Sequence, residues 1–109
     1  MRRGEQLLQG TLELLVLKTL SWESLNGYAI ALWIKERTRD DILIEEGALY
    51  PALHRLEKRG LVQGEWGQTE NNRKARFYRL TPAGRRELKT QESNWTRYVR
   101  AVARVLQPV

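Results

Sequence analysis

The sequence predicts an α+β fold in which three short helices precede a two-stranded hairpin and one long helix follows it. Three observations predict this order. Apolar residues recur with helical spacing between residues 46 and 59, and a glycine ends the run. Two strand-like runs joined by a polar turn extend from there to residue 80. Thr81-Pro82 then opens the last helix, because threonine caps a helix and proline suits its first position. A helix followed at once by a hairpin is the order of a winged helix-turn-helix.

Residues 1–9 look like a lead-in, and the first helix is expected after Thr11, whose hydroxyl can accept a hydrogen bond from an N–H one turn later. Its main apolar stripe, spaced i, i+3, i+4 and i+8, consists of Leu12, Leu15, Val16 and Leu20. Leu14 and Leu17 lie off this stripe. Because a helix that is apolar on more than one face has two partners, we expect it to contact both the core and a second subunit.

The segment from Ser24 to Gly27 predicts a turn, and a second helix is expected over residues 28–39, where Asp40-Asp41 ends it. One side of that helix carries Ala29, Leu32 and Trp33. Residues 42–44, Ile-Leu-Ile, are a β-branched run that predicts a third, short strand.

The third helix has a well-defined register. Its core-facing stripe, spaced i, i+3, i+4 and i+7, consists of Leu49, Ala52, Leu53 and Leu56. The opposite side of the helix consists of Gly47, Pro51, His54 and Lys58, flanked by Tyr50 and Arg55. Because proline is tolerated only in the first turn, we expect the helix to begin near Gly47 or Ala48, with Tyr50 displaced from helical geometry.

The hairpin begins after Gly60, which is placed to end the third helix. Its first strand alternates Val62, Gly64 and Trp66 with polar residues, and residues 69–72 have turn chemistry. The second strand, residues 75–80, has Tyr78 and Leu80 on one face and Phe77 and Arg79 on the other. Four cations gather within seven residues: Arg73, Lys74, Arg76 and Arg79. Because like charges repel one another, a hairpin that only faced water would not need them.

In the last helix, apolar residues repeat every seven positions. One set is Leu88, Trp95 and Val102, and the interleaved set is Val99 and Leu106, with Glu92 as its polar member. Since this helix projects beyond the compact unit, its stripe predicts a homodimer. Trp95 has two interpretations. It packs in the seam between subunits, as aromatic residues at helical spacing usually do, or it stacks on a planar ligand held there.

Composition narrows the function. The formal net charge is +6, and residues 1–45 carry only 6 basic against 7 acidic side chains, so the positive excess lies further along the chain. That balance favours a polyanionic partner. With no cysteine and one histidine, we expect no metal, no other cofactor and no enzyme activity. No signal-peptide pattern and no apolar run of about 18 residues occurs, so a cytoplasmic protein without membrane contact is expected.

The polar face of the third helix is compatible with simple solvation. The neighbouring cations of the hairpin make double-stranded DNA the favoured partner. The alternative is a winged-helix module that binds an acidic protein through the basic hairpin. A sequence-specific footprint on duplex DNA separates the two hypotheses.

Three motifs carry a family resemblance. The strongest is Gly47-Ala48-Leu49-Tyr50-Pro51 followed by Leu53-His54-Arg55-Leu56-Glu57-Lys58-Arg59-Gly60-Leu61. The second is Arg73-Lys74 with Tyr78-Arg79-Leu80-Thr81 and Gly84, and the third is Asn26-Gly27-Tyr28. From Gln9 through the last helix, the chain resembles the short form of the PadR family of bacterial transcriptional regulators. It departs from the family at Ala48, where Thr or Ser is frequent, and at Asn26, where His is frequent.

The resemblance implies a winged helix-turn-helix, residues 1–81, and a C-terminal dimerisation helix, residues 82–109. It implies a homodimeric repressor on a pseudo-palindromic operator. In some drug-sensing members a tryptophan of the last helix stacks on effectors between subunits, and Trp95 is placed where that tryptophan would be. A small-molecule effector is therefore a further hypothesis.

These inferences define two sets of residues. We expect DNA contacts from Tyr28, Tyr50, Pro51, His54, Arg55, Lys58, Arg73, Lys74 and Arg76. We expect subunit contacts from Leu14, Leu17, Leu88, Trp95, Val99, Val102 and Leu106. The helix side chains would enter the major groove or touch its rim, and the hairpin cations would hold the DNA backbone.

Overall fold

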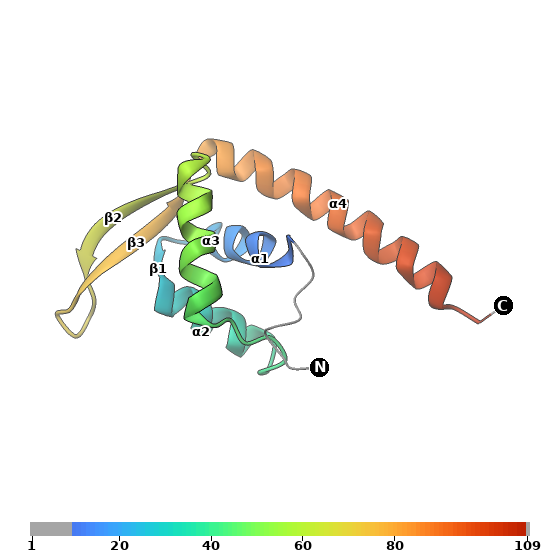
Figure 1. Ribbon diagram of the computed structural model, residues 1–109, viewed down its shortest axis with the longest axis horizontal. Coiled ribbons are helices and arrows are strands. Elements are labelled where there is room, and N and C mark those ends of the chain that lie inside the picture. Colours follow the sequence, from blue (N-terminus) through green and yellow to red (C-terminus); the bar gives the residue numbers. More distant parts are fainter. Residues whose placement is uncertain (1–9, 109) are drawn as a thin grey trace.

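The computed structural model describes residues 10–108, so the predicted lead-in at residues 1–9 lies outside the described part. The α+β prediction is confirmed, since these residues form four helices and a three-stranded antiparallel sheet. The β2–β3 hairpin and α4 leave the helical core on opposite sides (Figure 1). The elements in order are α1 (Thr11–Leu20), β1 (Leu25–Asn26), α2 (Gly27–Arg37), α3 (Glu46–Lys58), β2 (Val62–Gln68), β3 (Lys74–Leu80) and α4 (Pro82–Leu106).

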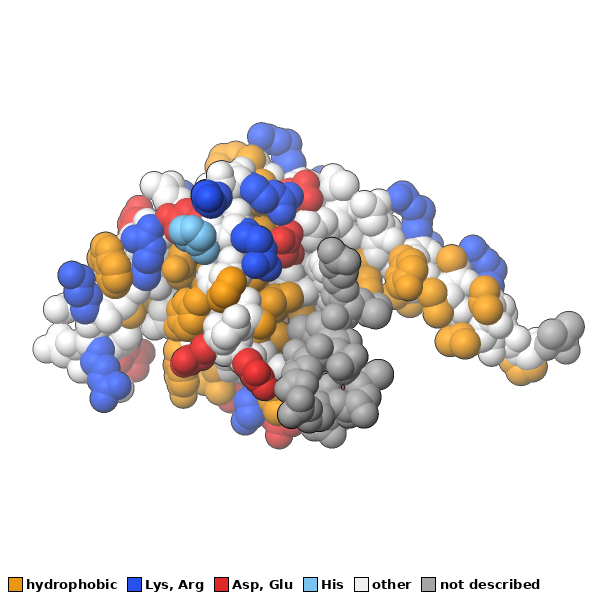
Figure 2. All heavy atoms as spheres, viewed as in Figure 1, with side chains coloured by type: hydrophobic (Ala, Val, Ile, Leu, Met, Phe, Trp, Pro, Cys, Tyr) orange, Lys and Arg blue, Asp and Glu red, His pale blue; other side chains and the backbone are white. Residues whose placement is uncertain are grey.

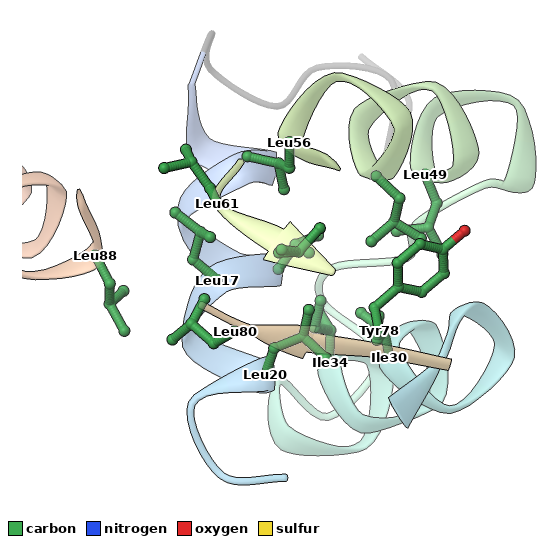
Figure 3. Close-up of a cluster of buried hydrophobic side chains, with 13 residues drawn as sticks. Leu17, Leu20, Ile30, Ile34, Leu49, Leu56, Leu61, Tyr78, Leu80 and Leu88 are labelled. Carbon is green, nitrogen blue, oxygen red and sulfur yellow. The ribbon is translucent and has the colours of Figure 1, made fainter. Parts of the chain in front are cut away.

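The first helix, α1, lies at the centre of the core, where it contacts α2, α3, β3 and α4. Its buried residues are Val16, Leu17, Thr19 and Leu20. The assignment of Leu17 to a subunit interface is therefore wrong, because this side chain is fully buried within its own subunit (Figure 3). Leu14 is only partly buried and stays available to a partner.

The third strand lies at a different place from the one predicted. Leu25 and Asn26 pair with Tyr78 and Phe77 of β3, so the predicted turn is in fact β1. Asn26 also caps α2, since its side-chain oxygen accepts a hydrogen bond from the Ala29 N–H at 2.8 Å. This cap gives the family departure at Asn26 a structural role.

Residues 42–44 form no strand, and the sheet of the described chain has the order β1-β3-β2. Ile42 and Ile44 pack against the core instead, which partly buries these β-branched side chains without a strand partner. The second helix ends at Arg37 because the backbone turns left-handed at Arg39 and Asp40, with φ values of 52° and 66°.

The buried side of α2 also differs from the prediction. Ile30 and Ile34 are buried, whereas Leu32 is 36% exposed and Trp33 only flanks the core. The helix contacts α1, α3, β1 and β3, and its buried residues are Gly27, Ile30 and Ile34, so the side carrying Leu32 points away from the core.

The register of α3 is confirmed, with Leu49, Ala52, Leu53 and Leu56 all buried. The helix begins at Glu46, one residue before the predicted start near Gly47, but the predicted displacement of Tyr50 is wrong, because Tyr50 is helical. Pro51 lies inside the helix on its exposed face. The N–H that proline lacks would have bonded the carbonyl of Gly47, which is exposed and can bond water instead.

The last helix begins as predicted. The Thr81 hydroxyl accepts a hydrogen bond from the Gly84 N–H at 2.9 Å, and Pro82 occupies the first position. Leu88 is 6% exposed and packs into the core beside Leu80, so its assignment to the subunit interface is wrong (Figure 3). The first two turns of α4 still lie over the core, and the exposed part of the helix begins beyond them.

Candidate nucleic-acid interface

One side of α3 faces away from the core and is open to solvent. The residues predicted for DNA contact on this helix are all exposed: Tyr50, Pro51, His54, Arg55 and Lys58. Figure 2 shows Lys and Arg side chains around the single histidine and continuing over the hairpin. The helix face and the hairpin cations thus form one basic surface.

The two helices of the helix-turn-helix, α2 and α3, are in contact where the Tyr50 ring of α3 lies over Gly27 of α2. A methyl group added at Gly27 would lie 2.8 Å from the Tyr50 hydroxyl oxygen, so the phenol covers the start of α2. Tyr50 nevertheless keeps 44% of its surface exposed, and Tyr28, the second residue of α2, keeps 73%. Tyr50 therefore links the two helices and still presents an edge to a partner.

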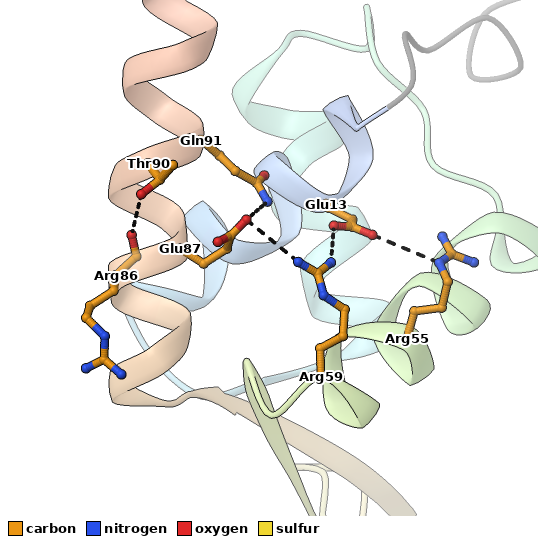
Figure 4. Close-up of polar contacts among 7 residues, drawn as sticks. All are labelled: Glu13, Arg55, Arg59, Arg86, Glu87, Thr90 and Gln91. Carbon is orange, nitrogen blue, oxygen red and sulfur yellow. Dashed lines mark hydrogen bonds and ion pairs between the residues drawn. The ribbon is translucent and has the colours of Figure 1, made fainter.

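An ion-pair network joins the C-terminal end of α3 to α1 and α4 (Figure 4). Arg59 Nη1 lies 3.0 Å from Glu13 Oε1, and Arg59 Nη2 lies 3.7 Å from Glu87 Oε2. Glu87 in turn accepts a hydrogen bond from Gln91 at 2.8 Å. No local sequence pattern indicates this network, because Arg59 and Glu13 are 46 positions apart along the chain.

Arg55 belongs to the edge of the same network. Its Nε lies 4.0 Å from Glu13 Oε2, and its side chain remains 57% exposed. An exposed ion pair of this length contributes only ~0–1 kcal/mol, so Glu13 holds Arg55 weakly and leaves it available to a phosphate or base.

Arg73 and Lys74 lie exposed where the hairpin turn enters β3. The Lys74 Nζ lies 5.0 Å from the ring centroid of Trp66, which is itself 63% exposed on β2. A cation over an exposed indole is oriented by the ring without losing its charge. Trp66 is therefore a functional candidate in the β2–β3 hairpin, the wing, although it was not among the residues predicted to contact DNA.

Arg76 lies in a different environment from the other wing cations. It donates from Nη2 to Glu57 Oε2 of α3 at 2.6 Å, and its side chain is 32% exposed. That hydrogen bond raises the pKa of the Arg76 guanidinium. Burial raises the pKa of the neighbouring Tyr78 phenol above its ordinary value, partly offset by the charge of Arg76. Arg76, which we predicted to hold the DNA backbone, is thus paired with Glu57 in the free chain, and its contact with DNA stays a prediction.

The exposed part of α4 carries an apolar stripe. Trp95, Val99 and Val102 are between 37% and 43% exposed, and Leu106 is 77% exposed. Beside the stripe, an open cleft of about 490 Å³ separates the start of α1 from the middle of α4. Its lining residues are Gly10, Thr11, Leu14, Gln91, Asn94, Trp95 and Tyr98.

Residues 10–108 contain no group of three or more side chains placed to hold a metal ion. None of the helices in this part of the chain is long and apolar enough to span a bilayer.

Comparisons with known proteins agree with this geometry. Residues 16–90 match the model of the Transcriptional regulator PadR-like family. Over 57 residues, 51% of this chain and 52% of the other, the sequence is 44% identical to Transcriptional regulator Rv3488 from Mycobacterium tuberculosis. A transcriptional regulator from Clostridium thermocellum has a solved structure with a TM-score of 0.83, at 26% identity, covering 91% of this chain and 96% of that one. A PadR family transcriptional regulator from Eggerthella lenta gives a TM-score of 0.79 at 34% identity, with 93% and 86% covered.

Proposed function

We propose that this chain, which belongs to the PadR-like family of transcriptional regulators and so is a DNA-binding regulator of transcription, is a homodimeric repressor of an inverted-repeat operator. The observation that supports the proposal most strongly is the exposed face of α3 beside the exposed cations Arg73 and Lys74 of the wing. Family members of this kind act by binding rather than by catalysis, and we propose that this chain does the same in the cytoplasm.

The outward face of α3 supplies the sequence-reading contacts of the proposed complex. An α-helix fits the major groove, where each base pair presents its own pattern of donors and acceptors. His54 and Lys58 lie at the centre of the exposed face, and Arg55 and Tyr50 flank it. Pro51 lies on the same face and offers an apolar contact at its rim.

The wing and α2 supply the proposed backbone contacts. Arg73 and Lys74 are exposed and carry full charges, so each phosphate that they neutralise releases a counterion and makes binding salt-dependent. Tyr28 extends from the first turn of α2, where its hydroxyl can donate to a phosphate.

The apolar stripe of α4 supplies the proposed subunit contact. Leu14, Trp95, Val99, Val102 and Leu106 remain in the proposed interface, because each keeps exposed surface in the single chain. We propose that residues up to 81 form the DNA-binding domain and that residues 82–109 form the dimerisation helix, whose first two turns also complete the core. A dimer bound over a promoter would then exclude RNA polymerase and repress transcription.

The cleft beside Trp95 favours a second candidate function, the sensing of a planar aromatic effector. The Trp95 and Tyr98 ring centroids lie 6.2 Å apart with an angle of 38° between their planes, so two aromatic rings face one open space. A flat ligand stacked there would gain ~0.5–1.5 kcal/mol per aromatic pair beyond its burial.

The test of the main proposal is selection of bound sequences from a pool of random duplex DNA, followed by a footprint on the recovered duplex. We expect an inverted repeat whose two halves are both protected, and repression when that duplex overlaps a promoter in a transcription assay. Recovery of sequences without a shared motif would contradict operator recognition.

A further inference from the structure

The Arg76 side chain lies on the face of the β2–β3 hairpin that carries Trp66 and Tyr78, and it reaches Glu57 of α3. In the register of the sheet, Arg76 stands opposite Trp66, and Gly64 is its diagonal neighbour on β2. A methyl group added at Gly64 would lie 2.6 Å from Arg76 Nε and 2.8 Å from Nη2. The guanidinium therefore fills the space that a side chain at position 64 would occupy.

Three further groups fix the guanidinium in this place. Its Cζ lies 5.6 Å from the Trp66 ring centroid and 6.0 Å from the Tyr78 ring centroid. Its hydrogen bond to Glu57 joins β3 to α3, and the Glu57 and Arg76 side chains are only 31% and 32% exposed. A charge-assisted hydrogen bond that is partly shielded from water is stronger than a surface ion pair.

Arg79 on the same strand provides a direct contrast. It projects from the opposite face of β3, donates to Gln63 Oε1 at 2.5 Å and lies 3.8 Å from Glu65 Oε1. Its side chain is 49% exposed and that of Glu65 is 64% exposed. Both partners of Arg79 belong to the hairpin itself, so its contacts leave the angle between hairpin and helix unconstrained.

Glu57 also places a negative charge on the helix that faces the DNA in the proposed complex. By charge alone, a carboxylate there weakens binding to phosphates. Because Glu57 accepts a hydrogen bond from Arg76, its role is to hold the hairpin against α3.

We propose that Glu57 and Arg76 are positioning residues for sequence recognition, because together they fix the angle at which the wing leaves α3. With that angle fixed, the wing cations reach the DNA backbone while the α3 side chains are in register with the bases. The complex then forms without the entropic cost of ordering the wing. This inference rests on the proposed function, in which α3 and the wing contact one DNA duplex.

The experiment compares Glu57→Gln with the matched control Glu65→Gln, since each removes one negative charge beside an arginine of β3. Each variant is titrated with a duplex recovered from the random pool and with a scrambled duplex of the same length. If charge alone matters, both substitutions tighten binding to both duplexes. We expect Glu57→Gln instead to weaken binding to the selected duplex about tenfold, the scale of one hydrogen bond to a charged group. Binding to the scrambled duplex is expected to stay the same or to tighten.

Arg76→Lys is the second variant, with Arg79→Lys as its control, and it serves if Glu57→Gln does not fold. Lysine keeps the charge but lacks the planar guanidinium that lies over Gly64. We expect Arg76→Lys to lose the preference for the selected over the scrambled duplex, while the salt dependence of binding to the scrambled duplex stays unchanged. A loss that is equal on both duplexes, with a flatter salt dependence, would show that Arg76 contacts phosphate and would overturn the inference.

Backbone ¹⁵N relaxation of the free protein measures the wing directly. We expect Glu57→Gln to increase the motion of the Gly64 and Gly67 amides relative to the core, and Glu65→Gln to leave it unchanged. Unchanged wing motion and undiminished selectivity in Glu57→Gln would refute the inference. If the wild-type chain itself does not prefer the selected duplex, operator recognition fails, and the role of the pair in recognition fails with it. The relaxation result then shows only whether the pair holds the wing.

Discussion

Replacing Val99 and Val102 with aspartate should separate the proposed dimer into single chains. In the single chain these side chains keep 43% and 37% of their surface exposed, and this is the part that a partner would cover. Complete burial of a valine is worth ~1.5–3 kcal/mol, so the exposed fractions correspond to about 0.5–1.3 kcal/mol per side chain. A dimer contains four of them, which gives about 2–5 kcal/mol.

That loss alone raises the dissociation constant of the dimer roughly 30- to 3,000-fold, since each 1.4 kcal/mol is tenfold. Aspartate adds to it, because each carboxylate would be buried without a partner or would have to take up a proton. Both positions lie on the exposed part of α4, beyond the turns that pack on the core, so we expect the isolated subunit to stay folded.

The assay is analytical ultracentrifugation, with Thr90→Asp and Ser93→Asp in one chain as the matched control. These two residues are also three positions apart and exposed, but they lie on the opposite side of α4. We expect the control to sediment with the wild-type dimer and the valine variant to sediment near the 12.8 kDa of one chain. A valine variant that sediments as a dimer at wild-type concentrations would show that the stripe is not the interface.

Three other predictions follow from the same structure. Lys74→Ala should weaken binding to the selected and scrambled duplexes by similar factors and flatten the salt dependence of binding. Arg55→Ala should instead cost ~1–3 kcal/mol more binding free energy on the selected duplex than on the scrambled one. If each variant lost as much affinity for the scrambled duplex as for the selected one, this division of roles would be contradicted. Gly84→Ala should lower the free energy of unfolding by ~1–3 kcal/mol or more in a denaturant titration, because a methyl group there would collide with a backbone carbonyl oxygen; Gly47→Ala, with nothing within 4 Å, should cost nothing. If Trp95 packs between the subunits, Trp95→Ala should destabilise the dimer by ~3–5 kcal/mol, and planar dyes should not quench the tryptophan fluorescence of the wild type. Saturable quenching by such dyes that is lost in Trp95→Ala would instead establish the effector site.

Local periodicity was sufficient to predict α3 and the start of α4. The stripe containing Leu49 and Leu53 and the cap formed by Thr81 depend on neighbours within one or two turns, so their signal is contained in a short stretch of sequence. The two-residue strand β1 has no such signal, because its pairing with β3 is set by tertiary contact. Residues 42–44 had the composition of a strand, but packing on the core satisfied their apolar side chains.

Sequence spacing was not sufficient to assign the apolar residues of the proposed interface. A heptad pattern shows that Leu88 is buried but does not show by which subunit, and α4 still lies over its own core at that point. Leu17 was misassigned for the same reason. The pairs formed by Arg59 with Glu13 and by Arg76 with Glu57 join residues 46 and 19 positions apart, so no local pattern indicated them.

The most direct test of the proposed two-fold recognition is a change in the spacing of the half-sites. In a symmetric dimer the two α3 helices must meet the same face of the DNA, with half-site centres about one helical turn, ~10 bp, or a multiple apart. Inserting about 5 bp between the halves rotates one of them to the opposite face, and inserting about 10 bp restores the face. We expect the shorter insertion to reduce affinity to that of the scrambled duplex in a binding titration. Undiminished affinity for the 5-bp insertion would contradict symmetric recognition by the dimer.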